Sequence, residues 1–332
     1  MAFGAVLAPV VALPGAGVAS ADDGSGADCA IHGKGVIEKG VTVWSDKSGG
    51  VAIAQFATQE VELEVSDFPA DATGRAHVRT GGSGASFRIN GWIDPTKIPI
   101  SAKGDIAIVP DHVWIGRGQN LKWRGSEPGK LLVETTIAAT QQLLKAKATC
   151  GTVTVGPVTT DEDVEIPKGA KKWKVKSSSI DLYGEPGGGV IFTIDLPAPE
   201  SGILLWSTDP ISTYVHVHHF GSEVIDAYAK YGDLTPLPKG EMLDELAGPG
   251  SVTIAPAKLK VEGAIKQITA PKDVPLRLTA NDATKPIGTI ESGAEVTVID
   301  TVGGWSRVFP KGLEIIPPDG KDFWVKASDL GL

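Results

Sequence analysis

The chain repeats itself at a fixed spacing of 139 residues (216 minus 77). His77-Val78 returns as His216-Val217, and the same spacing relates Val43-Trp44 to Leu182-Tyr183. Further pairs keep this register: Gly49-Gly50-Val51 with Gly188-Gly189-Val190, Trp92 with Tyr231, and Pro99 with Pro238. A repeat of this kind indicates modules, each with its own face to bury, and argues against one large enzyme core.

A third copy closes the chain. At a spacing of 232 residues (324 minus 92), the segment from Trp324 to Leu330 aligns with the segment from Trp92 to Ile98. Upstream of it, short strands are expected at 286–290, 294–299 and 304–308, because apolar and polar residues alternate there between Gly and Asp residues.

The segment from Val274 to Leu330 resembles the bacterial SH3-like domain family. The residues that carry the resemblance are the hairpin IGTIESGAEVTVID (287–300), the strand GGWSRV (303–308) and a closing aromatic-Val strand. The copies at 41–98 and 180–237 keep the leading strand, the Gly-Gly-Val turn and the closing aromatic, but lack the middle Gly-Trp pair. The resemblance implies small, partly open β-barrels that bind cell-wall peptides or other proteins and perform no chemistry.

We therefore expect a mostly β chain of tandem small SH3-like β-barrel modules with additional strand-rich connecting segments. The expected parts are a signal peptide (1–21), a flexible N-terminal segment (22–35), a first SH3-like module with a strand-rich extension (36–157), a linker (158–168), a second module (169–242), a connecting segment (243–270) and a third module (271–332). The fold of 104–157 is left open, and the run 136–147 fits either a short helix or a strand pair. The duplicated unit is longer than one barrel, because 112–115 resembles 251–254.

Residues 1–21 have the composition of an export signal. They are apolar and end in Ala19-Ser20-Ala21, which fits the small-x-small rule for cleavage. No Lys or Arg precedes Lys34, which leaves open a true start upstream of Met1. We expect an extracytoplasmic protein, periplasmic or secreted, with no transmembrane segment, because a spanning helix needs about 20 apolar residues.

The only two cysteines, Cys29 and Cys150, bracket the first module. In an oxidising compartment such a pair is expected to close into a disulfide. The alternative is two unrelated buried thiols.

The net charge of −9 argues against nucleic acid as a partner, because phosphate binding needs a basic face. One local exception surrounds Trp173, where lysines recur at positions 168, 171, 172, 174 and 176. This cluster is interpreted as a solvated strand edge that discourages aggregation, with an anionic-polymer site as the alternative.

The sharpest candidate for chemistry is the histidine cluster at 216–219. On a strand, His216 and His218 project from one face and His219 from the other, so the first pair could bind Zn²⁺ or Cu²⁺ if a carboxylate such as Asp209, Glu223 or Asp226 joined them. The alternative is a polar outer face whose opposite side holds valines. Apart from this site, no cofactor is expected.

Repeated aromatic residues are the candidate ligand-binding positions. They are Trp44, Trp92, Tyr183, Tyr231, Trp305 and Trp324. Aromatic faces commonly line recognition grooves, but large aromatics also fill the cores of small barrels. Both interpretations stay open at this point.

Phosphate-loop, zinc-protease, serine-elbow and Cys-x-x-Cys motifs are all absent from the sequence. We therefore expect no enzyme, but an exported binding or scaffolding protein of the cell envelope or extracellular space, with a cell-wall peptide or glycan, or a protein, as partner. The rival hypothesis is a metal-binding protein or hydrolase that uses the His216/His218 strand face. The sequence does not indicate the ligand or the oligomeric state.

Overall fold

The computed structural model describes residues 29–57, 59–80, 87–137, 140–159, 166–197, 203–238, 263, 266–311 and 315–332. In these residues the chain consists of β-strands and short 3₁₀ turns, with no α-helix. The strands form sheets of 14, 9 and 4 strands, and none of these sheets closes into a barrel. The prediction of a mostly β protein is confirmed. The predicted signal peptide lies outside the described residues.

The strands fall into four successive units. Unit 1 contains β1 (Ile31–Ile37), β2 (Thr42–Trp44), β3 (Ala52–Phe56), β4 (Gln59–Ser66), β5 (Ala76–Thr80), β6 (Phe87–Ile93) and the 3₁₀ turn η1 (Pro95–Lys97). Unit 2 contains β7 (Ile100–Ala102), β8 (Ile106–Val109), β9 (Val113–Ile115), β10 (Asn120–Glu127), β11 (Lys130–Thr136), β12 (Leu143–Thr149), η2 (Cys150–Thr152) and β13 (Val153–Val155).

The second half of the chain has the same order. Unit 3 contains β14 (Lys171–Val175), β15 (Ser179–Tyr183), β16 (Val190–Asp195), β17 (Leu205–Ser207), β18 (Tyr214–Phe220), β19 (Glu223–Lys230), η3 (Tyr231–Asp233) and β20 (Leu234–Pro236). Unit 4 contains β21 (Lys266–Thr269), β22 (Val274–Leu276), β23 (Gly288–Ile290), β24 (Glu295–Val302), β25 (Trp305–Pro310), β26 (Ile315–Ile316), β27 (Phe323–Lys326) and η4 (Ala327–Leu330).

Every unit pairs its strands in one pattern. The first strand lies antiparallel to the fourth, in the pairs β1–β4, β7–β10, β14–β17 and β21–β24. The second and third form a hairpin: β2–β3, β8–β9, β15–β16 and β22–β23. The next strands form a meander that ends at a closing strand, β6, β12, β19 or β27, followed by a 3₁₀ turn. Residues 100–155 are thus a further copy, where the sequence indicated only a strand-rich extension.

Burial follows the two-residue period of the strands. On β4, Val61, Leu63 and Val65 are buried, while Glu64 between them is exposed. Units 1, 2 and 4 contribute to one continuous hydrophobic core, and unit 3 has a second core around Trp173.

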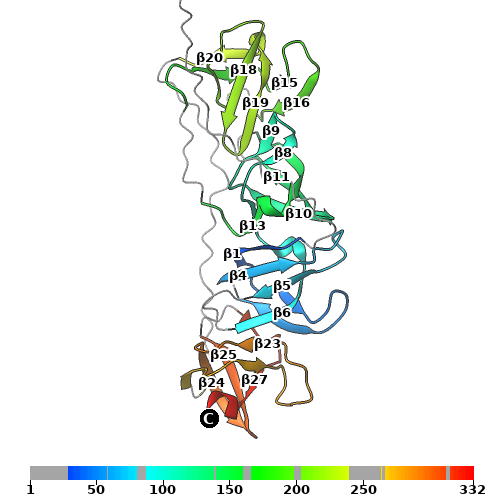
Figure 1. Cartoon of the computed structure of the whole chain (residues 1–332), viewed down its shortest axis with the longest axis vertical. Coiled ribbons are helices and arrows are strands. Elements are labelled where there is room, and N and C mark those ends of the chain that lie inside the picture. The colour runs from blue at the N-terminus through cyan, green and yellow to red at the C-terminus, as the bar shows by residue number, and fades with distance from the viewer. Residues whose placement is uncertain are drawn as a thin grey trace, which may run out of the picture.

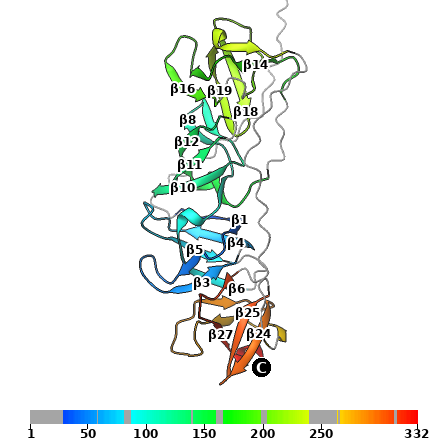
Figure 2. The same ribbon diagram turned by 180° about the vertical axis from the view of Figure 1, so that it is seen from behind.

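The units are stacked in an order that differs from the sequence. In Figure 1, unit 3 lies at one end of the molecule, followed by units 2, 1 and 4, and Figure 2 shows the same order from behind. Unit 4 packs on unit 1 through β23, which pairs with β6, and through β26, which pairs with β3.

The joint between units 3 and 2 repeats the joint between units 1 and 4. In the first, Val113 of β9 pairs with Ile225 of β19; in the second, Gly288 of β23 pairs with Ile89 of β6. Ile225 and Ile89 are equivalent, because each lies three residues before the closing aromatic of its strand. In both joints, therefore, the third strand of one unit pairs with the closing strand of its neighbour, and the register is the same.

The closing aromatic of unit 3 is Tyr228 and not Tyr231, which the spacing of 139 had suggested. Trp92 pairs with Trp44 and with His77, and Tyr228 pairs with Tyr183 and with His216. The spacing is 136 here (228 minus 92), because the segment from His216 to Tyr228 in unit 3 is three residues shorter than the segment from His77 to Trp92 in unit 1. Tyr231 instead begins η3.

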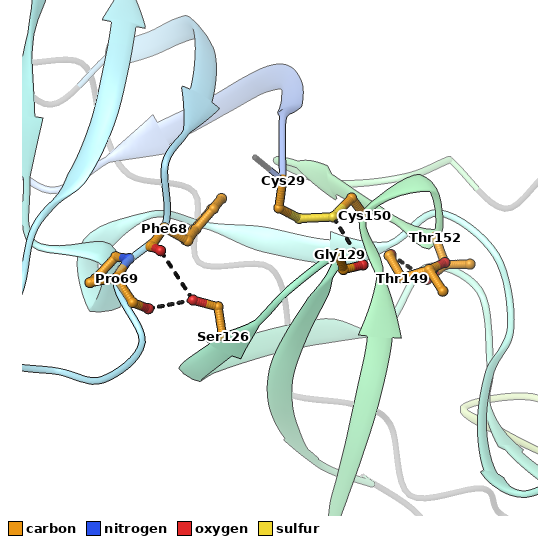
Figure 3. The surroundings of a disulfide bond; sticks show 8 residues. All are labelled: Cys29, Phe68, Pro69, Ser126, Gly129, Thr149, Cys150 and Thr152. Atoms are coloured by element: carbon orange, nitrogen blue, oxygen red, sulfur yellow. Dashed lines mark hydrogen bonds between the residues drawn. A yellow bond between two sulfur atoms is a disulfide. The ribbon is translucent and has the colours of Figure 1, made fainter. Parts of the chain in front are cut away.

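Units 1 and 2 meet through β1 and β13, which pair in parallel at Gly33 and Val155. The disulfide between Cys29 and Cys150 crosses this contact, as Figure 3 shows, with an S–S distance of 2.01 Å. The Sγ atom of Cys150 lies 3.4 Å from the carbonyl oxygen of Gly129. The predicted disulfide is confirmed.

A second part of this contact lies beside the disulfide. In Figure 3 the hydroxyl of Ser126 points toward the carbonyl oxygens of Phe68, at 3.2 Å, and of Pro69. On the β13 side, the Thr154 hydroxyl donates to the carbonyl of His32 at 2.7 Å. Polar groups of unit 2 thus bind the backbone of unit 1 at both edges of the contact.

Three expected connections differ in detail. Residues 31–35, expected to be flexible, belong to β1, and residues 266–269, expected to connect modules, form β21. Of the two alternatives for the run 136–147, the described residues favour the strand pair: β11 ends at Thr136, β12 begins at Leu143, and these two residues pair. In the linker 158–168, the described residues form no helix or strand.

Candidate functional site

The six candidate aromatic residues lie in three units and do not form one groove. In unit 1, Trp44 and Trp92 are half-buried, with Arg75 4.1 Å from the Trp44 ring centroid and His77 packed on Trp92 at 4.9 Å. The guanidinium and imidazole groups cover part of the indole faces, so both rings take part in packing and are only partly exposed at the surface.

In units 3 and 4 the aromatic residues differ in exposure. Tyr183 is buried, whereas Tyr231 is 44% exposed and contacts Trp173 edge-on at 5.9 Å. Trp305 and Trp324 are half-buried, and the Lys326 ammonium lies 6.0 Å from the Trp305 centroid.

A groove of about 740 Å³ opens on unit 2, at a place that the sequence did not indicate. It is lined by Ala107 and Ile108 of β8, Arg124 of β10, Leu132, Val133 and Glu134 of β11, and Lys145, Ala146 and Lys147 of β12. Its lining is apolar along β8 and β11 and basic along β12. It contains no hydroxyl, thiol or imidazole side chain.

The groove follows an open seam between β8 and β12. In the other units the equivalent strands are joined, through Trp44 with Trp92, Tyr183 with Tyr228, and Arg277 with Trp324. Among the described residues, β12 pairs only with β11 and is the last strand of its sheet. β8 lies alongside the other edge of β12, but the two strands form no backbone pairs there.

Two residues explain why the seam is open. In unit 4 the N–H of Arg277 donates to the Trp324 carbonyl at 2.9 Å. Arg277 directly follows Leu276, which pairs with Gly288 in the β22–β23 hairpin. In unit 2 the equivalent pair is Val109 with Val113, so the residue in the place of Arg277 is Pro110. Proline has no N–H to donate. A bulge at Ile108 also interrupts the register of β8 with β9.

The charges of the groove are partly balanced. Glu134 is buried and accepts a hydrogen bond from Arg124, and this bond holds the pKa of the Glu134 carboxyl below its usual value against the opposing effect of burial. Lys147 pairs with Glu127 at 2.8 Å, outside the groove lining. Lys145 also lines the groove and further lowers the pKa of Glu134.

The histidine cluster of unit 3 has the geometry that the sequence predicted. His216 and His218 lie on the outer face of β18, while Val215 and Val217 are buried on its inner face. The Nε2 atom of His216 lies 2.5 Å from Oδ1 of Asp226, and Nδ1 of His218 lies 3.7 Å from the same oxygen. One atom each of His216, His218 and Asp226 fall within 4.8 Å of one another.

Neighbouring rings fix both imidazoles. His216 stacks on Tyr228 at 4.6 Å between centroids, and His218 packs on Trp206 at 4.5 Å. Burial lowers the pKa of His218, and the nearby charge of His216 adds to this effect, while Asp226 opposes it.

Of the three carboxylates considered from the sequence, two reach the cluster. Asp209 contacts Nδ1 of His216 at 3.1 Å, and Asp226 lies directly opposite His218 on β19. Glu223 does not reach it, because its side chain is on the inner face of β19. There it is 1% exposed and neither carboxyl oxygen has a hydrogen-bond partner, and burial raises its pKa to about 7.

No protein-family model, no curated protein and no solved structure matches this chain. In the part of the chain that the structure describes, no helix has the length and apolar character needed to span a membrane.

Proposed function

We propose that the protein is an exported, non-catalytic binding or scaffolding protein of the cell envelope or extracellular space. We further propose that its four units are SH3-like modules. The shared strand order and the 3₁₀ turn after each closing strand support the second proposal. The disulfide supports an oxidising compartment, because such bonds persist in secreted and periplasmic proteins.

The groove of unit 2, beside a strand edge that forms no backbone pairs with its neighbour β8, is the observation that carries the binding function. An extended ligand in such a groove gains affinity from main-chain hydrogen bonds and specificity from side-chain pockets. The edge of β12 and the groove lined by Ile108, Leu132 and Ala146 provide both features.

The charges favour an extended peptide that carries carboxylates. Arg124, Lys145 and Lys147 line the groove; Arg124 pairs with Glu134 and Lys147 with Glu127, so Lys145 leaves one positive charge in excess. This local excess contrasts with the net charge of −9 of the whole chain. Peptides of the cell wall and acidic segments of proteins both have this chemistry.

Binding is tested with a fluorescent acidic peptide and a basic peptide of the same length, titrated with the full chain. We expect saturable binding of the acidic peptide only. Lys145→Glu should weaken it at least about 10-fold, because a close charge reversal is worth more than about 1.4 kcal/mol in a partly enclosed site. Co-sedimentation with cell-wall sacculi, with and without competing acidic peptide, separates a wall ligand from a protein ligand.

The matched control is Lys285→Glu, which makes the same charge change at an exposed position of unit 4. It should leave peptide binding unchanged. Equal loss in both variants would show that only net charge matters and would remove the groove from the proposal. Absence of saturable binding to either peptide and to sacculi would overturn the binding function itself.

A further inference from the structure

We propose that His216, His218 and Asp226 form a binding site for one divalent transition-metal ion, Zn²⁺ or Cu²⁺. The site is independent of the groove on unit 2, because it lies on the outer face of β18 and β19. Two imidazoles and a carboxylate are ligands that suit these ions, whereas Mg²⁺ and Ca²⁺ prefer oxygen ligands alone.

The ligand atoms are close enough to share an ion after small rotations. Zn²⁺ binds nitrogen and oxygen at about 2.0 to 2.2 Å, which places tetrahedral ligand atoms roughly 3.4 Å apart. The observed distances of 2.5 and 3.7 Å from Asp226 Oδ1 to the two imidazole nitrogens lie on either side of this value. The half-exposed Asp226 carboxylate can turn to admit the ion, while the stacked imidazoles stay in place.

Asp209 completes the arrangement as a positioning residue. Its carboxylate lies 3.1 Å from Nδ1 of His216 and accepts the Nδ1–H, while Nε2 shares a proton with Asp226 at 2.5 Å, which a bound ion would displace. A carboxylate behind a ligating histidine fixes the tautomer of the ring and raises its basicity. The hydrogen bond thus directs the lone pair of Nε2 toward the proposed ion.

The third ligand is also anchored from outside unit 3. The backbone N–H of Asp226 donates to the carbonyl of His112 at 2.9 Å, and the His112 Nδ1 lies 3.0 Å from the Asp226 carbonyl. His112 belongs to unit 2, so the joint between the two units holds the backbone at the site.

Unit 1 contains the same scaffold without the site. His77 is the equivalent of His216 and likewise packs on the closing aromatic. At the positions of His218 and Asp226, however, unit 1 has Arg79 and Asn90, which pair with each other. The His218–Asp226 pair is therefore specific to unit 3 and is not part of the scaffold that units 1 and 3 share.

The full chain is first freed of metal with a chelator. It is then titrated in a calorimeter with Zn²⁺, with Cu²⁺ and, as a negative control, with Mg²⁺. We expect one equivalent of Zn²⁺ or Cu²⁺ and no Mg²⁺. His218→Ala and the isosteric Asp226→Asn should each abolish saturable binding. Asp209→Asn should weaken it about 10- to 100-fold, the usual cost of losing such a supporting carboxylate. Bound Cu²⁺ should show nitrogen coupling in its electron paramagnetic resonance spectrum.

The matched control is His77→Ala, which removes the equivalent imidazole in unit 1 and should leave binding intact. Circular dichroism of every variant separates loss of the site from loss of the fold. If neither ion binds with a stoichiometry of one, or if His77→Ala costs as much as His218→Ala, the site does not exist. His216 is then only a hydrogen-bonded bridge between Asp209 and Asp226.

Discussion

Glu223 and Phe87 occupy the same position in the two equivalent joints of the molecule. Phe87 pairs with Ile290 between units 1 and 4, and Glu223 pairs with Ile115 between units 3 and 2. Phe87 packs on Phe323 with centroids 6.0 Å apart. The position equivalent to Phe323 in unit 2 holds Ala146, which lines the groove. The joint between units 1 and 4 thus contains a pair of buried aromatic rings, where the joint between units 3 and 2 contains the carboxyl group of Glu223 and the small side chain of Ala146.

Glu223→Gln should stabilise the protein in a pH-dependent way. Burial raises the pKa of Glu223 in the folded protein from 4.5 to about 7. Between these values the unfolded chain ionises while the folded protein keeps the proton, so stability falls as the pH rises, and the loss is complete above about 7. It amounts to about 3 kcal/mol. Urea unfolding should therefore show a gain approaching this size at pH 8 and almost none at pH 4.

The control for this prediction is Glu64→Gln, at an exposed position on β4. It should change stability little at either pH. A gain from Glu223→Gln that is equal at pH 4 and pH 8 would contradict the assignment of a buried ionisable carboxyl.

Gly156→Ala should break the contact between units 1 and 2. Gly156 has a φ of +78°, and a Cβ added there would lie 1.6 Å from the carbonyl oxygen of Lys34. The left-handed backbone alone costs roughly 1 to 2 kcal/mol for other residues, and the clash adds to it. Thermal unfolding should shift to lower temperature. Gly151→Ala, which meets no atom within 4 Å, should have little effect, and similar shifts in both variants would contradict the prediction.

Replacing both cysteines by serine should destabilise the same contact. Cys29 and Cys150 are separated by 121 residues, and closing a loop of that length stabilises by about 4 to 5 kcal/mol in the chain-entropy model. The urea midpoint of the double variant should fall to that of the reduced wild-type protein. Thiol titration of the unreduced protein should find no free thiol, and a count of two would contradict the bond.

Arg124→Leu should make the protein more sensitive to denaturant near neutral pH, but not in acid. The hydrogen bond from Arg124 keeps the pKa of Glu134 low, so its contribution is present above the usual pKa of glutamate and is lost as the pH falls. The difference from wild type in urea midpoint should therefore be large at pH 7 and small at pH 3, opposite in direction to Glu223→Gln. A difference independent of pH would assign the effect to packing.

Much of the local structure follows from the sequence because it depends on neighbours along the chain. Alternating residues in the segments 294–299 and 304–308 predicted short strands, and the spacing of His216 and His218 placed both on one face of a strand. The cysteine pair followed from composition and compartment. Unit 2 was missed because it lacks a closing aromatic, and the three-residue shortening before β19 misaligned Tyr231 with Trp92.

The sequence by itself determined the β character of the chain, the repetition of its units, and the residue types of the histidine cluster. Only the tertiary structure decided that unit 4 lies on unit 1, that Asp226 and not Glu223 faces the histidines, and that the seam of unit 2 is open. These relationships depend on which strand edges meet across long sequence distances. Edge pairing is made by backbone groups that every residue except proline shares, so the pattern of side chains reveals little of it.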